Sequence, residues 1–199
     1  MFTFRWHRFI EATKNRKPVG FLIEAVERLS SAGGLALDLG CGAGVDAKYL
    51  AENGFLVEAV DLDKNSIIQT RNICRGLPVK IIQKDIFDYN VKIDNYSLII
   101  SWNTLSFLDK EKAKNVLINI QEGLKTDGLF VFGLFGPEDD WAEKHSEMSF
   151  WTAEELKEIL SRMEFVKILE EKQKKPGATG EIKFWHLIQG IAKKNEVKT

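Results

Sequence analysis

The chain has 199 residues, 44% of them hydrophobic, so it can bury a substantial core without disulfides or metals, and one domain is the simplest division. Its net charge of −1 lacks the basic excess that nucleic-acid binding usually requires, so no nucleic-acid partner is expected. The first residues contain no signal-peptide core, and the longest apolar run, 129–135, is too short to span a bilayer. With two cysteines and no Cys-x-x-Cys pair, we expect a cytoplasmic protein without membrane association, disulfides or metal.

Strands and helices alternate along the chain without internal repeats. Amphipathic runs predict helices at 19–30, 45–53, 64–75, 110–124 and 152–161. Apolar runs predict strands at 35–38, 55–60, 79–83, 96–101, 129–134, 165–173 and 181–191. The first five are continuously apolar, as in a parallel sheet that is buried on both faces. The last two are joined by a link too short for a crossover, so they must pair antiparallel in this α/β fold.

Three glycines at alternate positions, Gly40, Gly42 and Gly44, follow the strand that ends at Asp38. A glycine-rich turn lets bare backbone approach a nucleotide-like ligand, because glycine tolerates positive φ and has no Cβ. A dinucleotide would place a pyrophosphate beside the Asp38 carboxylate, whereas S-adenosyl-L-methionine places a sulfonium and an ammonium there. A Gly-x-Gly-x-x-Gly fingerprint begun at Gly40 would also need glycine in place of Val45. The loop therefore predicts S-adenosyl-L-methionine as the cofactor.

Further acids follow the next two strands. Asp61 lies 19 residues (61 − 42) beyond Gly42, near the spacing at which a βαβ unit delivers an acid to ribose hydroxyls. Asp63 is better interpreted as the N-cap of the following helix. Asp85 follows the third strand, and an acid at such a position is common in ordinary turns as well as in ligand sites.

The pattern Asp-x-Gly-x-Gly-x-Gly at 38–44 resembles the cofactor loop of class I S-adenosylmethionine-dependent methyltransferases. Segments 6–18 and 183–186 resemble the tellurite-resistance methyltransferase-like small-molecule group, so the likeness covers almost the whole chain. It implies a Rossmann-like, seven-stranded, mostly parallel sheet with helices on both faces and a C-terminal antiparallel hairpin. Within one domain overall, it implies an N-terminal lid segment and helix at 1–34 and a methyltransferase domain at 35–199.

The resemblance also assigns roles to individual residues. Asp61 would accept the ribose hydroxyls, Asp85 would meet the adenine amino group, and Ile86 would pack on the adenine ring. Arg16 would pair with the methionine carboxylate, and a solvated basic turn is its alternative. The expected cofactor-binding residues are Asp38, Gly40, Cys41, Gly42, Gly44, Asp61, Leu62, Asp85, Ile86, Arg16 and Trp102.

The segment after the fourth strand, 101–107, limits which classes of methyl acceptor are expected. It lacks the Asn/Asp-Pro-Pro-Tyr/Phe motif that is common in amine-modifying nucleic-acid and protein methyltransferases, and the chain has no Pro-Cys nucleophile. By elimination, a small-molecule acceptor is favoured. Trp102 and Phe107 either line its pocket or pack in the core.

A general base is optional, because in-line displacement from a sulfonium releases a neutral thioether. His145, in the long segment 135–151, is the expected base if one is used. His186 is interpreted as a core histidine, about 16 Å down its strand from residue 181 at roughly 3.3 Å per residue.

Two segments are expected to enclose the site. Residues 1–18 form either a lid that the cofactor orders or a permanently docked helix. The hairpin at 174–181 and segment 135–151 would form the wall of the acceptor pocket, with Lys174 and Lys175 available to an anionic acceptor; a solvated turn is the alternative. Two other functions stay open: a non-catalytic S-adenosylmethionine-binding module and, against the glycine spacing, a nucleotide-cofactor oxidoreductase.

Overall fold

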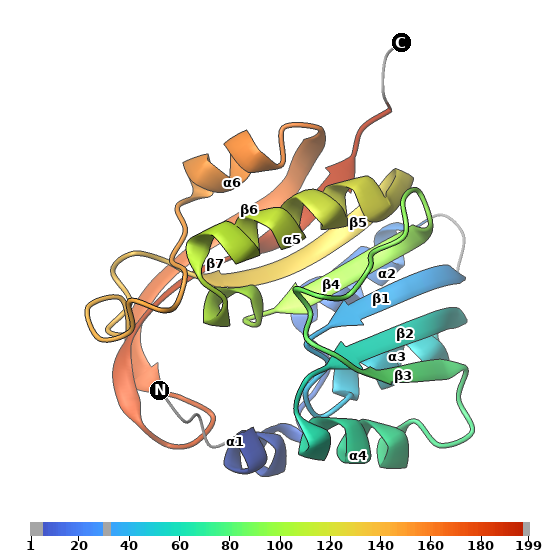
Figure 1. The fold of residues 1–199 in the computed structure, drawn as a ribbon, viewed down its shortest axis with the longest axis horizontal. Helices are drawn as coiled ribbons and strands as arrows, with labels where there is room; N and C mark the ends of the chain where they lie inside the picture. The colour runs from blue at the N-terminus through green and yellow to red at the C-terminus, as the bar shows by residue number, and fades with distance from the viewer. Residues whose placement is uncertain (1–5, 30–32, 197–199) are drawn as a thin grey trace.

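The computed structural model describes residues 6–29 and 33–196. Figure 1 shows helices and strands in the predicted alternation. The helices are α1 (Trp6–Thr13), α2 (Gly20–Arg28), α3 (Val45–Glu52), α4 (Lys64–Ile73), the 3-10 turn η1 (Leu105–Phe107), α5 (Lys110–Gly123) and α6 (Ala153–Ile159). The strands are β1 (Gly34–Leu39), β2 (Phe55–Asp61), β3 (Val79–Gln83), β4 (Tyr96–Trp102), β5 (Leu124–Phe135), β6 (Met163–Pro176) and β7 (Ile182–Lys194).

All seven strands form one sheet in the order β3-β2-β1-β4-β5-β7-β6. Strands β1 to β5 pair in parallel, whereas β7 runs antiparallel between β5 and β6. This arrangement confirms the expected Rossmann-like fold class with its C-terminal antiparallel hairpin. From β1 the chain runs outward to β2 and β3 and then crosses to β4 on the other side of β1. Open α/β sheets bind ligands in the crevice at such a switch point.

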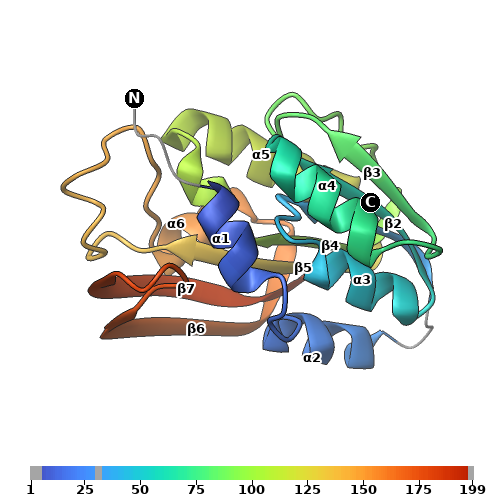
Figure 2. The same ribbon diagram turned by 90° about the horizontal axis from the view of Figure 1, so that it is seen from below.

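Helices cover both faces of the sheet, as Figures 1 and 2 show. On one face, Leu37 of β1 belongs to a buried cluster with Leu117 of α5. On the other face, its neighbour Ala36 belongs to a cluster with Leu22 of α2. Successive strand residues thus face two apolar layers, which is why the parallel strands read as unbroken apolar runs. No helix within the described ranges is long and apolar enough to cross a membrane.

The boundaries of two strands, β5 and β6, differ from the sequence prediction in ways that bear on the site. Strand β5 begins at Leu124 and not at residue 129, because Asp127 takes a left-handed φ of 65° inside the strand and the pairing with β4 shifts register nearby. Strand β6 continues to Pro176, so the connection to β7 is a tight turn in which Gly177 N–H donates to Glu181 O at 2.7 Å. The predicted end of helix 19–30 lies outside the described residues.

The β6–β7 hairpin projects beyond the rest of the sheet. β5 ends opposite Leu187, whereas the β6–β7 pairing continues as far as Pro176 and Ile182. The segment 182–186 therefore has only β6 beside it in the sheet, past the carboxyl end of β5. Because β6 runs parallel to β1 and β5, this overhang lies at the edge where the glycine loop lies, as the hairpin prediction required.

Candidate functional site

The glycine loop leaves β1 with three left-handed residues. Gly40, Gly42 and Gly44 have φ values of 79°, 53° and 77°. A Cβ on Gly40 would lie 2.7 Å from Thr104 Cβ, and one on Gly44 would lie 2.8 Å from Thr70 Cα. Glycine is therefore required at Gly40 and Gly44 by packing as well as by backbone conformation.

Asp61 is fixed by backbone donors from two directions. Its Oδ2 accepts from Gly42 N–H and its Oδ1 from Asp63 N–H, each at 2.8 Å. Burial raises the pKa of Asp61 above its ordinary value, and these two bonds oppose that shift. The carboxylate is held in one orientation and retains lone pairs for hydroxyl donors. Asp63 caps α4 by accepting from Ser66 N–H at 2.8 Å, which confirms its predicted role.

Asp38 is a buried carboxyl group with an unused oxygen. The residue is 3% exposed, and its Oδ2 has no hydrogen-bond partner among the described residues. Burial, with Asp46 nearby, raises the pKa of Asp38 well above its ordinary value, and Arg16 opposes the shift. An unpartnered buried acceptor of this kind is stabilised by a cation brought to it, so it fits the sulfonium and ammonium of S-adenosyl-L-methionine.

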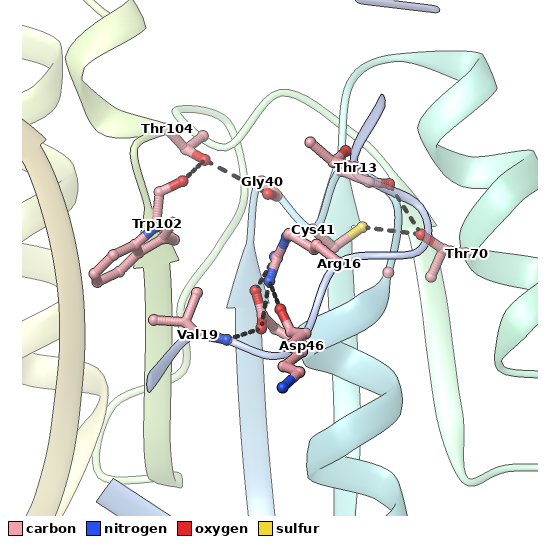
Figure 3. Close-up of polar contacts among 12 residues, drawn as sticks. Thr13, Arg16, Val19, Gly40, Cys41, Asp46, Thr70, Trp102 and Thr104 are labelled. Atoms are coloured by element: carbon pink, nitrogen blue, oxygen red, sulfur yellow. Dashed lines mark hydrogen bonds and ion pairs between the residues drawn. The ribbon is translucent and has the colours of Figure 1, made fainter. Parts of the chain in front are cut away.

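Arg16 holds the N-terminal segment against the loop, as Figure 3 shows. Its guanidinium pairs with both carboxylate oxygens of Asp46 at the start of α3, with 3.1 Å between Nη1 and Oδ1. The same Asp46 accepts from Val19 N–H at 3.0 Å. In this structure Arg16 is thus neither a solvated turn residue nor a free cation; it is two-thirds buried in an ion pair at the cavity.

Two contacts brace the loop from either side (Figure 3). Cys41 Sγ lies 3.6 Å from Thr70 Oγ1 of α4, and burial raises the pKa of the Cys41 thiol well above its ordinary value. On the other side, Thr104 Oγ1 donates to Gly40 O at 3.5 Å, and it also donates to Trp102 O at 3.2 Å. Cys41 is therefore a small, protonated residue in a tight turn, as its position in the sequence suggests.

These residues open onto a cavity of about 690 Å³, within the range of small-molecule sites. Ten of the eleven expected cofactor residues line it: Asp38, Gly40, Cys41, Gly42, Asp61, Leu62, Asp85, Ile86, Arg16 and Trp102. The exception is Gly44, which packs against Thr70. Helix α1 contributes Trp6, Phe9 and Thr13 to the lining. The side of the cavity with Asp38, Asp61 and Asp85 is called the loop side below.

The opposite side, called the aromatic wall, comes from elements far apart in the sequence. Phe107, Phe135, Trp141 and Trp185 line it. Phe135 lies 5.4 Å from Trp141 and 5.9 Å from Trp185, between ring centroids. Segment 135–151 and the hairpin thus both contribute, and the hairpin adds Gly177, Ala178, Thr179 and Glu181. Phe107 packs against Phe135 and Trp141 and also lines the cavity. The two predicted alternatives, pocket lining and core packing, are therefore not exclusive for this residue.

A buried lysine supports the aromatic wall from behind. Lys183 Nζ lies 3.8 Å from the Trp185 ring centroid and 4.1 Å from that of Trp141. The ammonium pairs with Asp139, whose other oxygen accepts from His186 N–H at 3.2 Å. The pair carries no net charge and ties segment 135–151 to the hairpin.

The structure does not bring the predicted base to the cavity. His145 is absent from the lining: its ring packs edge-on against Trp141 at 6.0 Å, and its Nδ1 lies 3.2 Å from Glu147 Oε1. The base role of His145 stays a prediction.

His186 is a satisfied core histidine, as interpreted, and it lies just past the carboxyl end of β5. Because the hairpin overhangs β5, His186 lies level with Gly136, whose N–H donates to His186 O at 2.7 Å. Nδ1 accepts from Glu138 N–H at 3.0 Å, and Nε2 lies 2.9 Å from Glu170 Oε1. Both ring nitrogens are engaged by the hairpin and its neighbouring loop.

Contrary to the prediction, the two hairpin lysines do not line the cavity. Lys175 Nζ pairs with Glu171 at 2.5 Å, and neither Lys174 nor Lys175 lines the cavity. Both belong to β6, which ends before the turn that reaches the cavity.

Asn103 is a cavity residue that the sequence analysis did not single out. It follows β4, lines the cavity, and has a left-handed φ of 53°. Its amide oxygen is buried without a partner among the described residues. Asn103 was missed because the Pro-Pro motif that usually follows such an asparagine is absent, although its position directly after a central strand could have indicated a site residue. The sequence resemblance included Trp185 in segment 183–186. It did not indicate that Trp185 lines the cavity, because that depends on how far the hairpin extends past β5.

A family model described as Tellurite resistance protein TehB matches residues 6–181. The probable S-adenosyl-L-methionine-dependent methyltransferase TehB of Haemophilus influenzae (strain 10810) is 31% identical over 137 residues, which are 67% of this chain and 47% of that protein. A carboxy-S-adenosyl-L-methionine synthase of Aeromonas salmonicida is 33% identical over 102 residues, which are 47% of this chain and 40% of that protein. The chain thus spans less than half the length of these two relatives.

Among solved structures, TehB from Haemophilus influenzae matches with a TM-score of 0.75 and 23% identity, over 89% of this chain and 62% of that chain. This likeness supports the fold. The family model covers nearly the whole described chain, from α1 to the hairpin turn. The chain therefore belongs to the TehB family, as its glycine loop and terminal segments indicated.

Proposed function

We propose that this protein is a methyltransferase that transfers the methyl group of S-adenosyl-L-methionine to a small-molecule acceptor by in-line displacement. The observation that carries the proposal is a single cavity with two chemically different sides, the carboxylate-rich loop side and the aromatic wall. A cofactor and an acceptor need such adjacent compartments so that the reacting atoms can meet. Membership of the TehB family supports the proposal.

The loop side has the groups that the cofactor needs. Asp61, held by two backbone donors, would accept the ribose hydroxyls. Asp85 and Ile86 would meet the adenine, and the unpartnered Asp38 oxygen would face the cationic groups. Arg16 would exchange its Asp46 partner for the methionine carboxylate or hold both. Cys41, Leu62, Trp102 and the loop glycines would complete the contact surface.

When bound, the cofactor supplies a methyl group on a sulfonium, and its leaving group is a neutral thioether. The aromatic wall and α1 would exclude water and hold the acceptor in line with the C–S bond. No proton acceptor is required for an acceptor that is already nucleophilic. In this proposal, residues 35–199 form the catalytic domain and residues 1–34 close over it. The proposal also places the protein in the cytoplasm, a location that the two free cysteines favour.

Calorimetry with S-adenosylhomocysteine, the demethylated product, tests the cofactor part. The wild-type protein should bind it, and Asp61→Ala should weaken binding by about 1–3 kcal/mol, the cost of leaving hydrogen bonds to a charged group unmade. The control is Glu111→Ala, which removes an exposed carboxylate outside the cavity lining. Binding of NADH instead, or unchanged affinity in a folded Asp61→Ala variant, would refute the assignment.

A second experiment separates the enzyme from the non-catalytic binding module. Deletion of Ala178 and Thr179 leaves Gly177, Gly180 and Glu181 between β6 and β7 and removes the part of the hairpin turn that lies beside α1. This variant should bind S-adenosylhomocysteine normally but transfer less labelled methyl to a small-molecule extract than the wild type does. A wild-type protein that binds the cofactor and transfers no label is a binding module, and equal transfer by both proteins removes the hairpin from the acceptor site.

A further inference from the structure

A buried carboxylate outside the cavity lining accepts hydrogen bonds from two tyrosines. Glu58 is 5% exposed in the middle of β2, opposite Leu37, whose side chain lies in the cluster beneath α5. Its Oε2 accepts from Tyr89 OH at 2.7 Å and from Tyr96 OH at 2.8 Å, and its Oε1 accepts from Lys80 Nζ at 2.9 Å. Burial acts to raise the pKa of Glu58, but these three hydrogen bonds lower it below its ordinary value, so the carboxylate is charged.

Stability alone does not explain a charged group at this position. Replacing a buried ion pair with apolar residues of similar volume is often neutral or stabilising. Val60, two residues further along β2, belongs to the apolar cluster and shows what this face of the sheet otherwise contains. A charged acceptor does form shorter and stronger hydrogen bonds than a neutral one. Glu58 therefore fixes the positions of two phenol oxygens, which lie 3.3 Å apart.

The two tyrosines differ in how their backbone is held. Tyr96 begins β4, where pairing with Leu124 of β5 holds its backbone in the sheet. Tyr89 lies in segment 84–95 between β3 and β4, which contains no helix or strand. The hydrogen bond to Glu58 therefore contributes more to the placement of Tyr89 than to that of Tyr96.

The second half of segment 84–95 is attached to the end of α5. Asp94 N–H and Asn95 N–H donate to Glu122 O and Gly123 O, at 3.0 and 2.9 Å. Val91 packs so closely against Gly123 that an added Cβ there would lie 2.4 Å from Val91 Cγ1. These contacts hold the half of the segment that lies away from the cavity.

The first half of the segment carries a turn that lines the cavity at Asp85 and Ile86. Within the turn, Asp85 Oδ1 accepts from Phe87 N–H at 2.9 Å, a local bond that shapes the turn without attaching it to the sheet. At its start, Lys84 N–H donates at 3.0 Å to the last carbonyl of β2. At its end, the Tyr89 phenol bonds the same strand. The turn is thus attached to β2 through the backbone on one side and through a side chain on the other.

From this arrangement, and resting on the proposed methyltransferase function, we infer that Tyr89 and Glu58 are positioning residues that make the cofactor site specific for adenine. Their hydrogen bond fixes the turn against β2, so that the second carboxylate oxygen of Asp85 can accept from the adenine amino group. Neither Tyr89 nor Glu58 lines the cavity, so both act through the turn. An amino group is selected only when its acceptor is held in place, because a displaced acceptor loses the hydrogen bond that distinguishes it from a carbonyl oxygen.

Tyr89→Phe and Tyr96→Phe form a matched pair, because each removes one donor to the same Glu58 oxygen and keeps its ring. Both should lower the urea midpoint of unfolding. Calorimetry with S-adenosylhomocysteine should separate them: Tyr89→Phe should weaken binding about tenfold, the scale of one lost hydrogen bond, whereas Tyr96→Phe should bind as the wild type does. A purely structural role for the cluster predicts equal affinity in the two variants, and this result overturns the inference.

Glu58 is tested from the acceptor side. Glu58→Leu removes the acceptor and should bind S-adenosylhomocysteine about as weakly as Tyr89→Phe does. Glu58→Gln keeps an acceptor of the same length and should recover part of the affinity. Wild-type affinity in a folded Glu58→Leu variant overturns the inference.

S-inosylhomocysteine, which carries a carbonyl oxygen in place of the adenine amino group, tests the specificity. The wild-type protein should bind it more weakly than S-adenosylhomocysteine, and Tyr89→Phe should lose most of this preference. If Tyr89→Phe weakens the binding of both ligands by the same factor, the turn does not select the amino group and the inference is wrong. Failure of the wild-type protein to bind S-adenosylhomocysteine refutes the proposed function instead.

Discussion

Replacing Gly40 with alanine tests the geometry of the cofactor loop directly. At a φ of 79° the new Cβ would lie 2.7 Å from Thr104 Cβ and closer still to Cγ2 and Oγ1 of the same side chain. Rotating Thr104 cannot clear its own Cβ, so the loop or β4 must move. A left-handed alanine costs about 1–2 kcal/mol, and overpacking typically adds about 1–3 kcal/mol. The expected destabilisation is about 2–5 kcal/mol, a large share of the roughly 5–15 kcal/mol that holds a domain folded.

Gly42→Ala isolates the backbone contribution. Gly42 is also left-handed, with a φ of 53°, but its added Cβ meets nothing closer than Ile10 Cδ1 at 3.9 Å. It should cost only the roughly 1–2 kcal/mol of the left-handed conformation. Urea unfolding of both variants gives the difference, and combining Gly40→Ala with Thr104→Gly should recover the packing part. Equal destabilisation by Gly40→Ala and Gly42→Ala would mean that the Thr104 contact is absent, and the loop geometry described above would be wrong.

Three further predictions concern the same cavity. Burial raises the pKa of Asp38 above its ordinary value of 3.8, so Asp38 holds its proton more tightly in the folded protein than in the unfolded chain. The contribution of Asp38 to stability therefore falls as pH rises from 3.8 through the raised pKa. The free energy of unfolding of Asp38→Asn should therefore exceed that of the wild type by a margin that grows with pH over this window; a constant margin contradicts the shift. Arg16→Ala leaves buried Asp46 without its cationic partner and should cost roughly 1–3 kcal/mol in urea unfolding, between exposed and buried ion pairs; an unchanged midpoint contradicts the pairing. Hydrogen exchange within α1 should slow when S-adenosylhomocysteine is added, whereas equal protection in both states indicates a permanently docked helix.

Much of the fold and of the loop side could be predicted because the signals are local. An apolar run, a glycine at each left-handed position and an acid at the next strand end are set by short-range backbone geometry. Asp61 needed only its spacing from Gly42, and Asp63 needed only its position before a helix. The antiparallel hairpin followed from the shortness of its link. Each of these inferences depends on fewer than about twenty-five residues of contiguous chain.

The aromatic wall could not be predicted in the same way, because it depends on register between distant segments. Whether Trp185 or Lys175 faces the cavity is decided by where β5 stops pairing with β7, and a shift of one residue in a strand exchanges its two faces. The Arg16 and Asp46 pair likewise joins residues thirty positions apart. No periodicity in the sequence contains that information.

The overhang of the hairpin also explains how one fold can keep its cofactor loop and change its acceptor. The strands that carry Asp38 and Asp61 are held on both sides by neighbours, so their carboxyl ends have little freedom to vary. Within the sheet, segment 182–186 pairs only with β6; its other contacts are with the loop 136–140 and include the buried Lys183–Asp139 pair. A change of length or sequence there therefore alters the aromatic wall without disturbing the glycine loop. Substitutions in the turn 177–181 should therefore change acceptor preference and leave S-adenosylhomocysteine affinity constant. If the two properties instead change together in calorimetry and transfer assays on the same variants, the two sides of the cavity are one coupled site.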